Sequence, residues 1–157
     1  MSFTPGSVQK EYALVASIDP ALALPEDKDE RENALRVARE TGNWAPLIKP
    51  GESPTLFWVR PLPGYLQTWI RGHAQRHQLS GEEAGVIALR LALRRFENFG
   101  GRGKCEIEKT EDEWLASKAD IAAITDVNPH DPSVGLNIVA ELGWVVFNRL
   151  MEGLSPK

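Results

Sequence analysis

The chain contains 157 residues, of which 42% are hydrophobic and 25% are charged, and its formal net charge is −4. This length predicts a single domain whose core is large enough to fold without disulfides, and the one cysteine, Cys105, excludes an internal disulfide framework. The acidic balance argues against a protein built mainly to bind phosphate backbones, and no stretch approaches a membrane span of about 18 apolar residues. We therefore expect a protein that is made and kept in a reducing cytoplasm, with no membrane partner.

The N-terminal third of the chain contains one predicted strand and one predicted helix. Residues 1–11 offer little to bury, so we expect a flexible arm there and a single, mainly helical domain over residues 12–154. The apolar segment Tyr12–Ile18 is typical of a strand. Glu26–Thr41 has acids in its first turn, arginines near its end and Gly42 after it, which predicts a helix. Its apolar face is narrow, so this helix is expected on the outside of the fold.

A loop, a strand and a helix are predicted in the middle of the chain. Prolines and glycines are dense over residues 43–54, which predicts a loop. Thr55–Arg60 is rich in β-branched and aromatic residues and has proline on both sides, so it predicts a short strand. Gly64–His77 has apolar residues at helical spacing and predicts a helix.

A capping-box pattern at Ser80 and Glu83 predicts the start of the next helix. Apolar residues then recur at helical spacing as far as the glycine-rich stretch Gly100–Gly103, namely Val86, Leu89, Leu93 and Phe96. We therefore expect this helix to continue to Phe99, with Arg90 on its solvent-facing side.

The segment after the glycines predicts a strand followed by a helix. Lys104–Lys109 alternates polar and apolar residues, which predicts a short strand or hairpin arm with Cys105 and Ile107 pointing inward. Thr110–Glu113 is a second capping-box pattern and predicts a helix that runs through Ala123.

The C-terminal segment predicts a long helix with a wide apolar face. Asp131 is placed to cap this helix and Pro132 to begin it. Taken together, the patterns predict a mainly α, that is α+β, fold of one domain, with about five helices and a small β element of two or three strands.

Few residues suggest chemistry. His73 and His77 have the spacing of two metal ligands on one helix, but no third ligand is evident and His130 lies in a distant turn, so the pattern favours ordinary histidines. Cys105 has no neighbouring base and is better explained as a small buried residue. Gly100–Gly103 lacks the Lys-Ser/Thr of a phosphate loop, which favours a flexible turn. We expect no catalytic residue, metal or cofactor, and no enzyme.

Three arginines favour a second interpretation. Arg90, Arg94 and Arg95 lie near the predicted end of one helix, and the two helices joined around Ser80 are faintly similar to a helix-turn-helix. Arginines in a last turn also complement the helix dipole, and Glu97 is spaced to pair with Arg94. The acidic net charge argues against nucleic acid as a partner, so a DNA-binding regulator is a further alternative only.

The last predicted helix carries a tryptophan on a polar stripe. Asn137, Glu141 and Asn148 fall within one arc of the helix, and Trp144 lies in the middle of it. Since interfaces favour tryptophan surrounded by polar residues, we hypothesise that these four residues bind a protein partner. The alternative is that another part of the chain covers Trp144.

Three segments support a family resemblance: Phe57–Leu62, Arg95–Phe99 and Leu136–Leu150. They resemble the tail assembly chaperone and tail accessory group, small proteins encoded among the tail genes of long-tailed bacteriophages. In that group a strand of the form apolar-Arg-Pro-Leu precedes a helical body, a helix ends near Glu-Asn, and the chain closes on a helix containing Glu-Leu-Gly. The similarity covers roughly residues 55–154, and the N-terminal third has no matching counterpart.

The resemblance implies a non-enzymatic role in phage morphogenesis, with no catalytic residue to carry over. It favours a chaperone that binds tail tube or tape-measure protein in the host cytoplasm during assembly. The alternative is a minor structural component of the virion at a tail, connector or capsid interface. Other phage structural proteins are then the expected partners, and a homo-oligomer is compatible with either role.

Overall fold

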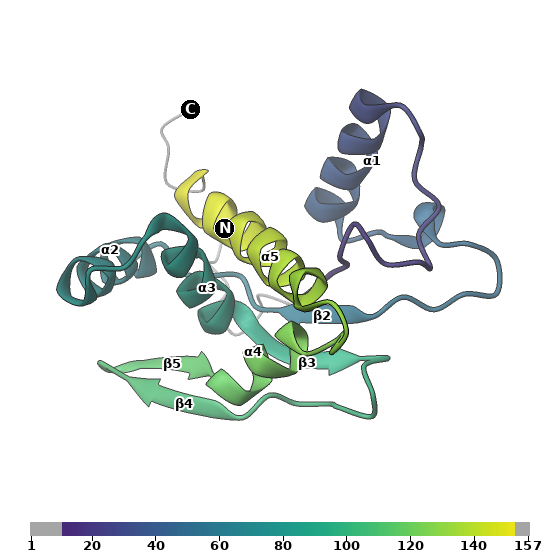
Figure 1. Ribbon diagram of the computed structural model, residues 1–157. Coiled ribbons are helices and arrows are strands. Elements are labelled where there is room, and N and C mark those ends of the chain that lie inside the picture. The colour runs from purple at the N-terminus through teal and green to yellow at the C-terminus, as the bar shows by residue number, and fades with distance from the viewer. Residues whose placement is uncertain (1–10, 153–157) are drawn as a thin grey trace, which may run out of the picture.

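Five α-helices and two small antiparallel sheets build the fold in the computed structural model, which describes residues 11–152 (Figure 1). The expected α+β fold of one domain is confirmed. The expected flexible arm, residues 1–11, lies outside the described residues except for Glu11, which pairs with Arg95 at 3.2 Å.

A three-stranded sheet separates two apolar cores. Its strands, in the order β1-β2-β3, are β1 (Tyr12–Leu14), β2 (Leu56–Val59) and β3 (Leu93–Glu97). Successive side chains of a strand point to opposite faces, so Phe57 and Val59 enter the larger core, whereas Leu56 and Trp58 pack against the smaller one. The sheet is therefore covered on both faces.

The smaller core lies beneath α1 (Lys28–Thr41), which confirms the helix predicted over Glu26–Thr41. Asp27 accepts a hydrogen bond from the backbone N–H of Glu30 and caps the first turn, and Gly42 ends the helix in the left-handed conformation, with φ of 74°. Leu35 and Ala38 are its buried residues, and they pack with Trp44, just before the short 3-10 helix η2 (Ala45–Leu47). α1 thus lies on the outside of the fold, as its narrow apolar face predicted.

Four helices enclose the larger core: α2 (Leu66–His77), α3 (Gly81–Ala92), α4 (Lys118–Thr125) and α5 (Pro132–Glu152). The predicted capping box is confirmed, because Ser80 and Glu83 exchange side-chain to backbone hydrogen bonds of 3.2 Å. α5 lies across α3, with α1 on its other side (Figure 1).

α5 is the longest helix and the central one. Its length and composition alone would allow it to cross a membrane, which the sequence analysis did not anticipate. Ile138, Leu142 and Val146 lie in the larger core, a position typical of the core helix of a globular protein. Gly143 lies against the backbone of Gly85, so α5 and α3 approach closely.

The prediction that the helix after Ser80 continues to Phe99 is wrong, because α3 ends at Ala92 and β3 begins at once. Leu93 is extended, with φ of −64° and ψ of 131°, and pairs with Val59, while Phe96 pairs with Phe57. The register shifts between these pairs, so the three residue steps from Leu93 to Phe96 on β3 lie opposite the two steps from Val59 to Phe57 on β2. This bulge places Leu93 and Phe96 on the same face, and their spacing of three imitates a helix.

The prediction that Thr110–Glu113 starts a helix is also wrong, because this segment is the turn of a hairpin. The hairpin joins β4 (Ile107–Thr110) and β5 (Glu113–Ala116), and Glu111 and Asp112 between them have φ of 47° and 68°. Two consecutive residues with positive φ match the twist of paired strands. The helix α4 begins later, capped by Ser117.

The strand predicted over Lys104–Lys109 is shorter than expected and begins at Ile107. Cys105 is buried, as predicted, but Ile107 is exposed. Cys105 donates its backbone N–H to the carbonyl of Arg94, so the chain at Cys105 runs alongside β3 before it enters the separate hairpin.

Candidate functional site

A groove of about 750 Å³ lies between α1 and α5. Trp144 lines it with 60% of its surface exposed. The buried residues Leu35 and Val145 also line the groove and form its apolar floor. A large exposed aromatic side chain in a groove with an apolar floor is typical of a protein-binding surface.

The four residues predicted to bind a partner have separate positions. Trp144 and Asn148 line the groove. Glu141 also lines it, but its carboxylate accepts the backbone N–H of Ser17 at 2.8 Å and pairs with Arg39 at 3.3 Å, so it holds the N-terminal segment against α5. Asn137 is exposed and is not among the lining residues. The structure thus brings three of the four together and gives Glu141 an internal role.

The groove has charged rims of both signs. On α1, Arg36 pairs with Glu40 at 3.1 Å in an exposed position. On α5, the guanidinium of Arg149 lies 4.2 Å from the ring centre of Tyr12, and burial raises the pKa of that phenol. A polar rim around an apolar floor gives a partner both area to bury and groups to pair with.

The three arginines considered for nucleic acid are engaged within the chain. Arg90 is buried rather than solvent-facing, donates to the carbonyl of Ala116 at 2.8 Å and pairs with Glu108 at 3.2 Å. Arg94 donates to the carbonyl oxygens of Leu93 and Trp114, and burial lowers its pKa to about 10. Arg90 and Arg94 therefore bind backbone carbonyls of β3 and β5, and this structural role explains their presence.

Arg95 is the third arginine, and it lies on the other face of the sheet. Its guanidinium stacks 4.2 Å from the ring centre of Trp58, next to the smaller core. The three arginines therefore do not share one basic face.

Cys105 lies in a buried environment that disfavours the thiolate. It is 9% exposed, and burial, helped by the nearby carboxylate of Asp120, raises its pKa to about 12. A protonated buried thiol is a packing residue.

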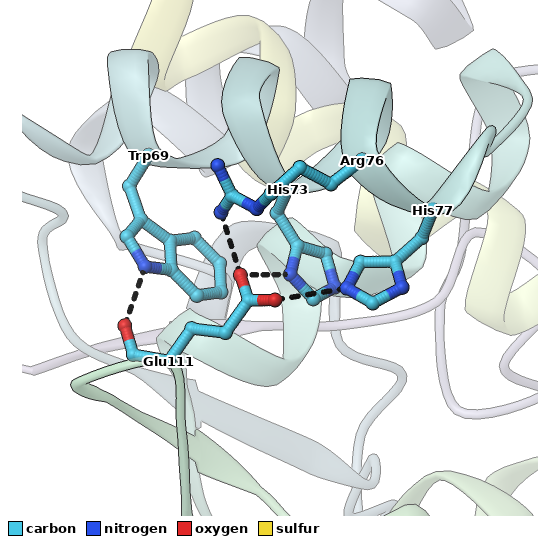
Figure 2. Close-up of polar contacts among 5 residues, drawn as sticks. All are labelled: Trp69, His73, Arg76, His77 and Glu111. Atoms are coloured by element: carbon cyan, nitrogen blue, oxygen red, sulfur yellow. Dashed lines mark hydrogen bonds and ion pairs between the residues drawn. The ribbon is translucent and has the colours of Figure 1, made fainter.

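A polar cluster joins α2 to the tip of the β4–β5 hairpin, as Figure 2 shows. The carboxylate of Glu111 accepts the ring N–H of His73 (Nδ1) and of His77 (Nε2), each at 2.9 Å, and pairs with Arg76 at 2.6 Å. The hydrogen bonds from Arg76 first, and then from the two histidines, hold the pKa of Glu111 well below its usual range. Glu111 is therefore an ionised carboxylate, and each imidazole is the donor.

Trp69 completes this cluster. Its indole N–H donates to the backbone carbonyl of Glu111 at 3.0 Å, and its ring stacks on His73 with centres 4.9 Å apart. Glu111 keeps a left-handed backbone that a side chain of this kind rarely adopts. The contacts from α2 to both its carbonyl and its carboxylate hold it there.

The sequence analysis did not find the role of Glu111. The spacing of His73 and His77 was the available signal. Because Thr110–Glu113 was predicted to start a helix, there was no reason to expect Glu111 beside α2. Once the segment is a hairpin turn, its tip reaches α2 across 34 and 38 residues of sequence. Among the described residues, His73, His77 and Glu111 are then a group whose ligand atoms, within 4.8 Å of one another, could hold a metal ion.

No protein-family model, curated protein or solved structure matches this chain.

Proposed function

We propose that this protein is a non-enzymatic binding protein of bacteriophage morphogenesis, and specifically a tail assembly chaperone that binds tail tube or tape-measure protein in the host cytoplasm. The phage assignment rests on the resemblance of the segment Phe57–Leu62, which begins within β2, and of the final helix to that group. The binding role rests on the structure of the groove between α1 and α5.

The exposure of Trp144 is the observation that carries the binding role. A tryptophan side chain that is 60% exposed beside buried Leu35 and Val145 leaves a large apolar surface in water. Residues of this type contribute most to binding when a partner covers them. The groove is formed by two helices, which suits a partner segment that lays an apolar face between them.

The charges of the groove favour a partner segment that carries basic residues. Glu32 on α1 and Glu152 on α5 both line the groove, and neither pairs with another residue within 11–152. The two arginines that α1 contributes to the groove are already paired, Arg39 with Glu141 and Arg36 with Glu40. A segment with an apolar anchor for Trp144 and lysine or arginine beside it would complement both features.

The test is a binding measurement with purified tail tube protein and tape-measure segments of the same phage. Trp144→Ala should weaken the complex roughly 30-fold, the loss expected for an interface residue worth about 2 kcal/mol. Trp114→Ala is the matched control, because Trp114 is 52% exposed on the hairpin, away from the groove, and its loss should leave the affinity unchanged. Equal effects of the two variants, or no complex with either partner, would refute the proposal.

Mass spectrometry of purified particles separates the chaperone from a structural role. A chaperone is present in the infected-cell lysate and missing from finished particles. A fixed copy number in particles would instead support the alternative of a minor virion component, with Trp144 as an expected contact.

A further inference from the structure

The cluster of His73, His77 and Glu111 has the geometry of a metal site. His73 Nδ1 and His77 Nε2 each lie 2.9 Å from a different oxygen of Glu111, and all the ligand atoms lie within 4.8 Å of one another. In a tetrahedral zinc site with bonds of about 2.0–2.1 Å, neighbouring ligand atoms are roughly 3.4 Å apart. Small side-chain rotations would therefore seat an ion between these atoms.

The donor atoms select the class of metal. Two imidazole nitrogens and one carboxylate oxygen suit Zn²⁺ and other late divalent transition metals, whereas Mg²⁺ and Ca²⁺ prefer oxygen ligands alone. Three protein ligands leave a fourth position, which water would take. The side chain of His77 is 50% exposed, so this position is accessible from solvent.

The ligands are held in place before any metal binds. His73 stacks on Trp69 with ring centres 4.9 Å apart and contacts the tilted ring of His77 at 4.4 Å, and its side chain is only 10% exposed. Trp69 also fixes the backbone carbonyl of Glu111. Support of this kind from outside the ligand set is what orients metal ligands in proteins.

We propose that His73, His77 and Glu111 bind one divalent transition-metal ion, which joins α2 to the tip of the β4–β5 hairpin. When the ion binds, the proton on the metal-facing nitrogen of each imidazole moves to the other ring nitrogen, Nε2 of His73 and Nδ1 of His77, so that two nitrogen lone pairs and one Glu111 oxygen face the metal. Its role is structural, because it adds metal bonds between α2 and a hairpin tip that otherwise contacts these residues through hydrogen bonds and an ion pair. This inference is independent of the groove between α1 and α5.

Arg76 distinguishes a metal site from a cluster that only holds α2 and the hairpin together by hydrogen bonds, which we call the hydrogen-bonded clamp. Its guanidinium lies 2.6 Å from Glu111 Oε2 and competes with a metal for that oxygen, yet its side chain is 55% exposed and can turn into solvent. In a metal-free clamp Arg76 is one of the stabilising groups. At a metal site it is a competing cation, so its removal should favour binding of the ion.

The experiment uses the full-length chain without a histidine tag, stripped with a chelator, and measures zinc binding by calorimetry and thermal unfolding. We expect one Zn²⁺ per chain and a zinc-dependent rise in Tm. His77→Gln and Glu111→Gln should weaken binding tenfold or more, while Arg76→Ala should bind zinc as tightly as the wild type or more tightly, although its metal-free Tm falls. His130→Gln is the matched control, because His130 is exposed and outside the cluster, and it should bind like the wild type.

Several results would overturn the metal site. One is the absence of zinc binding by the wild type, and another is equal loss of binding in His77→Gln and His130→Gln. Weaker binding in Arg76→Ala would also overturn it and favour the hydrogen-bonded clamp. Circular dichroism of each variant shows that a loss of binding is not a loss of fold; a variant that fails this check is replaced by His77→Ala, at a half-exposed position.

Discussion

The contact between Gly143 of α5 and Gly85 of α3 gives a direct test of how these two helices pack. A Cβ atom added at Gly143 would lie 2.7 Å from the backbone oxygen of Gly85 and 2.9 Å from its carbonyl carbon. Non-bonded atoms of this kind pack at about 3.5 Å, so the two helices would need to separate by roughly 0.8 Å. Backbone on both sides cannot rotate away, so the cost should lie in the upper half of the range for overpacking, at about 2–3 kcal/mol.

The replacement of glycine within a helix offsets part of this cost. Alanine is more favourable than glycine in a helix by about 1 kcal/mol, so Gly143→Ala should lower the free energy of unfolding by a net amount of roughly 1–2 kcal/mol. For a chain of this size the Tm should fall by roughly 2–8 °C. Urea denaturation followed by circular dichroism measures the free energy, with an unchanged m-value showing that both states keep their compactness.

Gly85→Ala is the control, because the same contact is asymmetric. A Cβ atom at Gly85 would lie 3.6 Å from its nearest neighbour, the carbonyl carbon of Gly143, which is an ordinary contact distance. This variant should therefore be as stable as the wild type or up to about 1 kcal/mol more stable. A Gly143→Ala variant with wild-type stability, or equal destabilisation by both changes, would refute the close approach of α3 and α5.

Two further predictions concern the segment between β3 and α4. Ser117→Ala should lower the free energy of unfolding by about 2 kcal/mol, because the buried Ser117 hydroxyl both accepts the backbone N–H of Asp120 and donates to its carboxylate. Urea denaturation measures this loss, and a value below about 0.5 kcal/mol would contradict the prediction. At pH 8 the Cys105 thiol should remain protonated, because burial raises its pKa to about 12. A chromogenic disulfide reagent should therefore label it only as the chain unfolds. Complete labelling of the native protein within seconds would contradict this prediction, because it would show that the thiol is accessible.

Local sequence signals predicted several helix boundaries correctly. Ser80 and Asp131 act within a few residues of themselves, and α3 and α5 begin where these residues predicted; Gly42 likewise ends α1 as predicted. The end of α3 depends instead on β2, more than thirty residues earlier, whose pairing converts Leu93–Glu97 into a strand. The bulge then preserves a spacing of three between buried residues, so periodicity alone could not distinguish strand from helix.

The choice between two similar capping patterns shows a second limit. Both Thr110–Glu113 and Ser117–Asp120 have a hydroxyl residue followed three positions later by an acid, and the second is the true cap of α4. The first lies in a hairpin turn because β4 and β5 pair with each other. The cluster of His73, His77 and Glu111 forms only when that turn reaches α2. The spacing of the two histidines was therefore visible in the sequence, whereas the participation of Glu111 was not.

The direct passage from α3 into β3 fixes how long this part of the chain can be. Leu93 is both the residue that ends α3 and the first residue of the strand, so there is no linker to absorb a change in length. One residue inserted between Ala92 and Leu93 would move Phe96 from the core to the opposite face of the sheet. The exposed turn at Gly100 and Gly101 lies only a few residues later and is free of this restriction. A fluorescent or affinity label placed within the chain therefore belongs in that turn, where it would leave the junction, the groove and the α2–hairpin cluster intact.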